Sequence, residues 1–461
     1  MLRVDMRKEM FNHEINILRD TYRRLLRRQA KTNLIKITRK THPADLATVF
    51  RHFTDEEQIE IFTLMNENEH TAEFLSELDD ALVNDLLANE SLERIASIIE
   101  KAPTNDQSGI LNVLEEEKAK SVIELLNADE QEEIAEIMGY PEDSAGALMN
   151  TEVFTLHEGI TAGEAIKTLQ DQEGAEMVFY LYITDDDDRL VGVISLRALT
   201  TTPSTTTLKD IMIKNVHSIR PETDQEEVAR VVAQYNYLAV PVIDPDSHLL
   251  GIVTVDDVVD VIREEATEDF LQMAGAGKDR EILLKSSWEN AKTRLPWLFA
   301  SWVGGLIAAY LIGIFENMLE NIIALAAFIP VILGMGGNIA TQSSTIIVRG
   351  MATGRVNIGG EIKLILKEMQ VGLLLGILYG ILLGVFAKIT FANAHDYLGV
   401  VVGLSICVSM IVAATVGTII PLILRKLDID PAVATGPFVT TSIDVLGVLF
   451  YFLIAGLFLS I

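Results

Sequence analysis

Long apolar stretches fill the last third of the chain, whereas the first two thirds alternate short apolar and polar positions. Five stretches lie at about 297–319, 322–347, 369–393, 398–424 and 433–460. Each reaches the ~20 residues that a helix needs to cross the hydrocarbon core of a bilayer. The pattern therefore predicts five transmembrane helices, with the chain ends on opposite sides of a membrane. The N-terminus is polar and basic, so we expect no signal peptide.

Basic residues in the loops between these stretches indicate the orientation, because cytoplasmic loops carry an excess of Lys and Arg. The bases in or near the second and fourth loops are Arg349, Arg355, Lys363, Lys367, Arg425 and Lys426. The first loop has no base, and the third has Lys388 at most. We therefore expect a multi-pass protein of the cytoplasmic membrane, with the N-terminus in the cytoplasm and the C-terminus outside.

Two of the apolar stretches contain helix breakers and polar side chains. The second has Asn338 and Gln342 beside several glycines, and the fifth has Thr440, Thr441 and Asp444 after two prolines. Close helix packing explains the glycines. A carboxylate at membrane depth must face protein or water, and it marks a functional site by default. Because the bases lie at the loops, we expect Asp444 to face an aqueous path for a cation.

Successive amphipathic helices are predicted from residue 41 to about 140. In "HPADLATVFRHFTDEEQIEIFTLM" the apolar residues recur at helical spacing, and Thr54 followed by Glu57 is typical of a helix N-terminus. The later segment "NADEQEEIAEIMG" repeats the pattern. We expect a small stack of helix pairs, preceded by a basic helical extension at 1–40.

An internal repeat occupies residues 149–262. "LVGVISLRAL" (190–199) matches "LLGIVTVDDV" (249–258) at an offset of 59, and "LMNTEVFTL" (148–156) matches "IMIKNVHSI" (211–219) at an offset of 63. Each copy predicts an extended segment, a helix, two strands joined by a turn, and a second helix. The repeat resembles the cystathionine-β-synthase (CBS) pair, a regulatory module whose copies pack about a pseudo-twofold axis.

This resemblance implies a nucleotide site, because a Ser/Thr-x-x-Asp motif at the last strand–helix turn of such copies can hold the ribose of an adenine nucleotide. Thr254 and Asp257 form the motif in the second copy, whereas Ala198 replaces its acid in the first. Tyr180 and Arg197 are further candidate contacts. ATP or another adenine nucleotide is therefore one expected ligand, and a pair that acts only as a scaffold is the alternative.

Charge is distributed unevenly along the 461 residues, whose net charge is −29. The first 40 residues hold 12 bases and 4 acids, whereas residues 41–294 hold 54 acids and 18 bases. This acidic middle would repel phosphates, so we expect no nucleic-acid partner and favour cations. The single cysteine, Cys407, excludes a disulfide framework within one chain and indicates no thiolate metal site.

Acidic side chains crowd residues 255–275, directly after the repeat. Spacings of three and four place Asp257, Asp260, Glu264 and Glu268 on one face of a helix, and Arg263 is the only base in the segment. Like charges at these spacings destabilise a helix unless something neutralises them. Carboxylates suit hard cations such as Mg²⁺ or Ca²⁺, and no Cys or His cluster suits Zn²⁺. The pattern favours a divalent-cation surface, and a solvated acidic face is the alternative.

The order of segments resembles the MgtE family of magnesium channels and transporters over about residues 40–461. The motifs "PVILGMGGNIATQS" and "DPAVATGPFVTTSIDVLG" in the second and fifth spans carry this resemblance, with "HPADL" and "EATED" nearer the N-terminus. The expected fold is a multi-domain membrane protein. Its expected parts are a basic helical extension (1–40), an acidic all-α helical-stack N domain (41–140), α/β tandem CBS domains (141–262), a connecting plug helix (263–294) and a five-helix transmembrane domain (295–461).

The resemblance implies a homodimer with a pore at its twofold axis, in which two copies of Asp444 hold a hydrated Mg²⁺. The candidate pore residues are Asp444, Asn338, Thr440, Thr441, Gly447 and Asp430. Mg²⁺ gives up its waters reluctantly, so paired carboxylates can hold the ion through those waters and favour divalent cations.

The charge pattern and the resemblance together predict regulation by the transported ion. Acidic surfaces repel one another at low Mg²⁺, whereas bridging Mg²⁺ draws the domains together and closes the pore, which couples distinct sites. The candidate regulatory acids are Glu73, Asp106, Asp224, Glu226, Asp257, Asp260, Glu264, Glu265, Glu268 and Asp269.

Two other functions remain open alongside the Mg²⁺-gated channel. An ion-coupled carrier also uses broken helices near the midplane, but the sequence offers no evident second transmembrane acid. A membrane-anchored Mg²⁺ or nucleotide sensor would not need Asp444 for conduction. We predict no enzyme activity, because no nucleophile–base pair, phosphate loop or catalytic metal motif is found.

Overall fold

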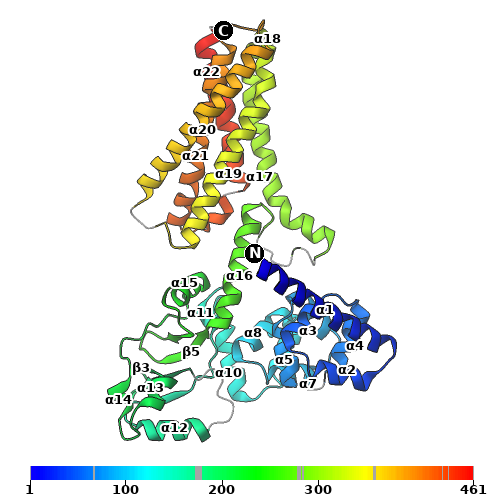
Figure 1. Cartoon of the computed structure of the whole chain (residues 1–461), viewed down its shortest axis with the longest axis vertical. Helices are drawn as coiled ribbons and strands as arrows, with labels where there is room; N and C mark the ends of the chain where they lie inside the picture. The colour runs from blue at the N-terminus through cyan, green and yellow to red at the C-terminus, as the bar shows by residue number, and fades with distance from the viewer. Residues whose placement is uncertain are drawn as a thin grey trace. The chain divides into compact units, whose positions relative to one another are not determined.

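The computed structural model describes residues 2–65, 68–171, 179–277, 282, 285–356, 360–427, 429–434 and 436–459. Two compact units, Met1–Val261 and Ile262–Ile461, divide the chain. The first contains the helical stack and the repeat, and the second contains the long apolar helices (Figure 1). Each unit buries hydrophobic clusters of its own.

A stack of short helices forms the first part of unit one (Figure 1). These helices are α1 Leu2–Arg27, α2 Lys31–Thr38, α3 Pro43–Phe50, α4 Asp55–Thr63, α5 Asn68–Ser76, α6 Asp80–Leu87, α7 Leu92–Ile99, α8 Thr104–Val113, α9 Glu116–Ile123 and α10 Ala128–Ile137. Helices two apart in the sequence are neighbours, so α3, α5, α7 and α9 follow one another in one layer and α4, α6, α8 and α10 in the other. Thr54 and Glu57 form the expected capping box at the start of α4.

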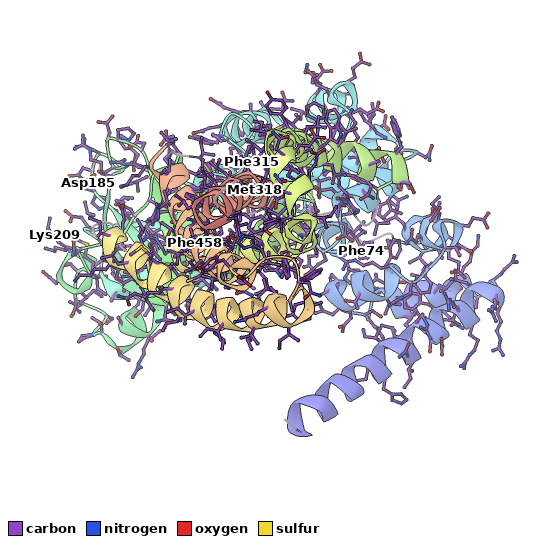
Figure 2. The ribbon with its side chains drawn as sticks, turned by 90° about the horizontal axis from the view of Figure 1, so that it is seen from above. Phe74, Asp185, Lys209, Phe315, Met318 and Phe458 are labelled. Carbon is purple, nitrogen blue, oxygen red and sulfur yellow. The ribbon has the colours of Figure 1, made fainter. Side chains whose placement is uncertain are left out.

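Aromatic side chains fill the core of this stack. Phe50 and Phe74 are fully buried, and their rings meet edge to face with centroids 5.0 Å apart; Phe74 is labelled in Figure 2. Tyr22 of α1 and Leu34 of α2 belong to the same buried cluster. The basic N-terminal segment is therefore helical and packs on the acidic stack.

The repeat forms two similar α/β halves. The first contains α11 Ala145–Leu148, β1 Thr155–His157, α12 Ala162–Asp171, β2 Tyr180–Thr184, β3 Leu190–Ser195 and α13 Leu196–Thr201. The second contains α14 Leu208–Ile211, α15 Gln225–Tyr235, β4 Ala239–Ile243, β5 Leu249–Thr254 and the start of α16 Val255–Met273. Tyr180 pairs with Ser195 in the first hairpin and Ala239 with Thr254 in the second, so the offset of 59 recurs in the strand register.

The two halves exchange their extended segments. Asn150, before β1, exchanges backbone hydrogen bonds of 2.8 and 2.9 Å with Ile252 of β5. Ile213, at the matching place in the second half, exchanges bonds of 2.9 and 3.1 Å with Val193 of β3. Each hairpin therefore receives its extra edge from the other half, which supports the pseudo-twofold arrangement.

Unit two has five helical segments of sufficient length and apolar character to cross a bilayer. They are α17 Ser287–Ile314, the continuous pair η1 Ile323–Phe328 and α19 Ile329–Ala352, α20 Glu361–Thr390, α21 Leu398–Lys426 and α22 Pro437–Leu459. Two short helices, α18 Glu316–Asn321 and η2 Pro431–Ala434, lie between them. The five predicted spans are thus present among the described residues (Figure 1). The segment 263–294 contains the end of α16 and the start of α17, and residues 278–281, 283 and 284 lie outside the described residues.

Close packing holds the bundle together. A Cβ on Gly384 of α20 would lie 2.6 Å from the carbonyl oxygen of Gly399 of α21, so only glycine permits this approach. Elsewhere in the bundle, Phe315 stacks on Phe452 with ring centroids 4.8 Å apart. Phe315 and its neighbour Met318 are labelled in Figure 2. Such contacts fix α22, which carries Asp444, against the rest of the bundle.

Candidate ion pathway and acidic regulatory surfaces

Asp444 lies in the second turn of α22, within an apolar helix of 23 residues. Its side chain is half-buried, and no hydrogen bond or ion pair joins it to any part of the chain that the structure describes. Burying a carboxylate without a partner is unfavourable. The position therefore needs water, a cation or another chain to complete it.

The neighbours of Asp444 on α22 face different helices. The γ-methyl of Thr441 lies directly against Gly304 of α17, where an added Cβ would overlap it. Gly447 is buried, and its Cβ position lies 3.3 Å from Leu333 of α19. Thr440 directs its hydroxyl to the backbone carbonyls of Gly436 and Pro437 of its own helix, at 3.3 Å each. Thr441 and Gly447 therefore serve helix packing in this chain.

Asn338 lies on an uncovered face of α19. Its side chain is exposed, as is that of Gln342 one turn later. Positions Gly334 and Gly337 on this part of the helix have open space, with no atom within 4 Å of an added Cβ. Two amide side chains in an apolar span are poorly suited to lipid. This face is therefore suited to water or to another protein surface.

Charged groups from three elements meet where α19 ends and α22 begins. Burial and the charge of Asp430 raise the pKa of Asp269, on α16, to about 6, and the guanidinium of Arg349 opposes this shift. Glu268 adds a smaller repulsion. Asp430 accepts a 2.8 Å hydrogen bond from the backbone of Ala432 in η2. Asp269 and Asp430, both singled out in the sequence, thus lie close enough to influence each other.

The end of α16 packs against the start of α22. Gly275 adopts φ of +70°, and its Cβ position lies 3.3 Å from Pro437 at the first turn of α22. A Cβ on Gly436 would lie 3.4 Å from the backbone nitrogen of Gly275. Gln272 of α16 is fully buried and donates a 2.8 Å hydrogen bond to Glu268. Movement of α16 would therefore disturb the helix that carries Asp444.

A second acid lies inside the membrane unit, contrary to the sequence-based expectation. Glu368 of α20 is only 6% exposed and accepts a 2.9 Å hydrogen bond from the hydroxyl of Ser343 on α19. Glu368 lies one residue before the third apolar stretch expected at about 369–393, so the sequence pattern leaves it outside the spans. The structure instead begins α20 at Glu361 and turns Glu368 inward.

A group of acids joins the N-terminal stack to the repeat within unit one. Asn105 of α8 donates a 3.0 Å hydrogen bond to Asp257. Burial and the charges of Asp256 and Asp106 raise the pKa of Asp257 to about 6. Burial, followed by the charges of Asp256, Glu77 and Asp260, also raises the pKa of Asp106, although a 2.8 Å hydrogen bond from Ser76 lowers it. Three predicted regulatory acids, Asp106, Asp257 and Asp260, therefore come together, and Asp256 and Glu77 join them.

The other predicted regulatory acids are dispersed. Asp224 caps α15 by accepting a 2.8 Å hydrogen bond from the backbone of Glu226. Glu73 is exposed on α5, and Glu264 and Glu265 are partly exposed on α16. Within the described part of one chain, no three His, Cys, Asp or Glu side chains are grouped closely enough to hold a metal ion.

Thr254 and Asp257 are the two candidate nucleotide residues that contact each other. The Thr254 hydroxyl donates to Asp257, whose other oxygen accepts from Asn105, so both oxygens are engaged. Arg197 is exposed at the start of α13. Tyr180 lies close to Tyr237, which belongs to the other half of the repeat. Burial raises the pKa of the Tyr237 hydroxyl, and Tyr235 and then Tyr180 add to this shift.

An aromatic group beside Tyr180 was missed by sequence reasoning. The imidazole of His217 stacks on Tyr235 at 4.6 Å between ring centroids, and Tyr235 stacks on Tyr237 at 5.4 Å. Tyr235 is the last residue of α15, and Asn236 after it adopts a left-handed conformation with φ of 54°, so the chain turns there and brings Tyr237 beside Tyr235. Flat rings of this kind suit stacking on a nucleobase.

These features define the class of the protein. Five apolar helices with a half-buried acid, attached to a helical stack and a CBS-like pair, form a multi-pass membrane transport protein that carries regulatory domains. Family models agree: residues 329–454 match the MgtE divalent cation transporter, residues 41–143 the MgtE intracellular N domain, and residues 145–202 and 208–264 the CBS domain. The chain belongs to the MgtE family, whose members are transporters and not enzymes.

Relatives resemble the chain over almost its whole length. The magnesium transporter MgtE of Bacillus subtilis is 33% identical over 418 residues, which cover 90% of this chain and 92% of the relative. The magnesium transporter MgtE of Thermus thermophilus is 35% identical, with 93% of this chain and 95% of the relative covered.

Solved structures resemble the first unit. The crystal structure of the soluble part of a magnesium transporter is 30% identical, with a TM-score of 0.50, and covers 55% of this chain and 99% of its own. The cytosolic domain of the Mg²⁺ channel MgtE in complex with ATP is 32% identical, with a TM-score of 0.51, and covers 53% of this chain and 99% of its own. Both support the fold of the helical stack and the CBS pair.

Proposed function

We propose that the protein is a Mg²⁺ channel of the cytoplasmic membrane, in which Asp444 is the ion-binding acid. The observation that carries the proposal is the half-buried Asp444 side chain, which lacks a cationic partner among the described residues of an apolar bundle. The relatives that cover 90% and 93% of the chain are magnesium transporters by name. A hydrated divalent cation is the ligand that a lone carboxylate at membrane depth can hold without being buried unpaired.

A homodimer completes the proposed pore. The uncovered face of α19, with Asn338 and Gln342, is polar where a lipid-facing helix should be apolar. A twofold axis beside this face would bring two such faces together and pair Asp444 with its copy. Asn338 and Thr440 then line the pathway, Asp430 lies at its cytoplasmic mouth, and Thr441 and Gly447 hold α22 in place.

Cytoplasmic Mg²⁺ is the proposed closing signal. Asp106, Asp257 and Asp260 lie close together in unit one, where burial raises the pKa values of Asp106 and Asp257 and neighbouring carboxylates, Asp256 among them, raise both further. Mg²⁺ bound between such surfaces, including those with Glu73, Asp224 and Glu226, would relieve the repulsion. The helix α16 carries Glu264, Glu265, Glu268 and Asp269 and packs on the start of α22, so it is the element through which closure reaches the pore.

The CBS pair is the proposed site for an adenine nucleotide. Tyr180, Arg197, Thr254 and Asp257 remain the candidate contacts, and the stacked tyrosines add surface for a base. A solved relative, the cytosolic domain of the Mg²⁺ channel MgtE, contains ATP. The proposed orientation in the membrane is the one expected from the basic loops, with unit one in the cytoplasm and the C-terminus outside.

Mg²⁺ influx into proteoliposomes tests the pore role of Asp444. Asp444→Asn keeps the shape of the side chain and removes its charge, so influx should fall at least about tenfold, the equivalent of ~1.4 kcal/mol in the barrier. Ser442→Ala, on the same turn, is the matched control, because the Ser442 hydroxyl bonds only its own helix at Phe438. Influx at the rate of the unmodified protein in Asp444→Asn would reject the channel and favour a non-conducting sensor.

An ion-coupled carrier is the second candidate, because Glu368 supplies a second buried acid. Such a carrier would need protonation or Na⁺ binding at Glu368, so Glu368→Gln would abolish Mg²⁺ influx. A channel predicts that Glu368→Gln conducts, and that influx follows the Mg²⁺ gradient whether or not a proton or Na⁺ gradient is imposed.

A further inference from the structure

Six basic side chains on the first two helices, or directly after them, are exposed and unpaired in the described chain. They are Arg24, Arg27, Arg28, Lys31, Lys36 and Lys40, here called the basic face. Within the described part of the chain, no hydrogen bond or ion pair engages any of the six. Their neighbours differ, since Arg19 pairs with Asp20 at 3.0 Å and Arg23 donates to the carbonyl of His52 at 2.7 Å.

The basic face is held in place by buried side chains on the other side of its helices. On the opposite side of the same helices, Tyr22, Leu26 and Leu34 are buried in the core of the stack. The Tyr22 hydroxyl donates a 3.2 Å hydrogen bond to Thr38, which ties α1 to α2. Buried anchors on one side therefore hold the bases outward on the other. The N-domain family match begins at residue 41, so this surface lies outside it.

The basic face remains unpaired although acids are abundant. Residues 41–294 hold 54 acids against 18 bases, yet none of the six bases is neutralised within the described chain. An unpaired cluster of this size attracts a polyanionic surface from outside the fold. The question is which polyanion the surroundings supply.

An anionic lipid surface fits best. Five candidate spans hold the chain in a bilayer, so lipid headgroups are present at high effective concentration. Clustered Lys and Arg near a membrane are attracted to its anionic lipids. Ile17 is 53% exposed and lies two helical turns before Arg24, on the same face of α1. An exposed apolar side chain beside bases suits an interface of headgroups and acyl chains better than it suits nucleic acid.

We propose that the basic face docks on anionic phospholipid headgroups of the membrane in which the protein is embedded. In cells, this docking rests on the proposed position of unit one in the cytoplasm. In vesicles it does not, because vesicles of symmetric composition offer the same lipids on both sides of the membrane. Docking would hold the N-terminal end of the stack at the membrane and leave the acidic surfaces free.

Energy transfer to labelled lipid tests this docking with the full chain. Cys407 is the only cysteine, so Cys407→Ser combined with Thr32→Cys places one donor dye on exposed Thr32, next to the basic face. Vesicles of phosphatidylcholine alone are compared with vesicles in which one third is phosphatidylglycerol, each with an acceptor on a headgroup and without Mg²⁺. Transfer should rise in the anionic vesicles and fall again in high salt.

A matched pair of variants separates docking from general charge. Arg24→Gln, Arg27→Gln and Arg28→Gln together should remove more than half of the rise. Lys101→Gln, Lys167→Gln and Lys214→Gln remove the same charge from exposed, unpaired positions elsewhere in unit one and should leave the rise intact. All six positions are exposed, so folding should persist.

Three outcomes would overturn the proposal. They are no rise with phosphatidylglycerol, an equal loss in both triple variants, and tighter binding of single-stranded RNA than of anionic vesicles to the basic face. Mg²⁺ influx is measured in the same vesicles. Loss of influx with lipid-dependent transfer intact would reject only the proposed channel, so the two proposals fail separately.

Discussion

Asn105 and Asp257 lie 152 residues apart, and the amide of Asn105 donates a 3.0 Å hydrogen bond to the Asp257 carboxylate. The bond joins α8 of the helical stack to the first turn of α16. The hydroxyl of Thr254 engages the other oxygen of Asp257. One acid therefore links the stack, the repeat and the helix that continues toward the membrane unit.

The protonation of Asp257 should make stability depend on pH. Its pKa rises from 3.8 to about 6 on folding, chiefly through burial, so the folded state binds the proton more tightly than the unfolded state. The contribution of Asp257 to stability is therefore fully present below about pH 4 and is lost as the pH rises through about 6, by at most ~3 kcal/mol. Without divalent cations, the thermal midpoint of unfolding should decrease over this range, and Asp257→Asn should decrease less.

Two comparisons check that dependence. Asp129→Asn removes a carboxylate from an exposed position of α10 and should leave the slope unchanged. Millimolar Mg²⁺ should flatten the slope of the unmodified protein, because a bound cation favours the ionised acid. A slope that is identical in Asp257→Asn would contradict the assignment of the shift to this residue.

Neutralising three acids should keep the channel open at millimolar Mg²⁺. Asp257→Asn, Asp260→Asn and Glu265→Gln together remove bridging charges from α16, so Mg²⁺ loses its hold on the closed state. Patch-clamp recording of excised membranes should show currents that persist as Mg²⁺ on the cytoplasmic side rises.

A charge-matched variant tests the specificity of that result. Glu93→Gln, Glu117→Gln and Glu132→Gln remove three exposed acids of the stack whose carboxylates have no partner in the described chain. This variant should close like the unmodified channel. Unchanged closure in the α16 variant would show that its acids are not the sensor.

Substitution by alanine should lower stability at Gly304 but not at the adjacent Gly305. A Cβ on Gly304 would overlap the γ-methyl of Thr441, whereas one on Gly305 meets nothing within 4 Å. Gly304→Ala should therefore push α17 from α22 and lower stability by about 1–3 kcal/mol, with little effect from Gly305→Ala. Thermal unfolding in detergent measures both. Thr441→Ser removes the methyl group and should restore part of the loss; equal midpoints for the two alanine variants would contradict the packing.

Two adjacent serines should differ in the same assay. Ser343 donates to buried Glu368, so Ser343→Ala leaves that carboxylate unsatisfied and should cost about 1–3 kcal/mol. Ser344 is fully buried, and its hydroxyl has no partner within the described residues, so Ser344→Ala should be neutral. A larger loss for Ser344→Ala would show that the Glu368 contact is unimportant.

Local patterns predicted the elements well. The capping signal at Thr54 and Glu57 was confirmed, because a helix start depends on residues within one turn. The repeat offset of 59 was confirmed in the strand register, because it reflects a spacing within each hairpin. The family resemblance was also confirmed over nearly the whole chain.

Contacts between distant elements were harder to predict. Glu368 was missed because its burial depends on which face of α20 meets α19, and a polar helix end gives no periodic signal for that. Asn105 was missed because a neutral amide in an acidic region is chemically unremarkable until its partner is known. The roles of the pore and regulatory acids stay predictions, since each needs an ion or a second chain.

The exchange of edge segments between the two CBS halves limits how this module can be rearranged. Asn150 completes the hairpin that contains Ile252, and Ile213 completes the one that contains Val193. A gene fragment encoding a single half would expose a naked backbone edge and would tend to recruit a second such fragment. The backbone hydrogen bonds of these two residue pairs therefore make each copy depend on the other, so the two copies must be kept together.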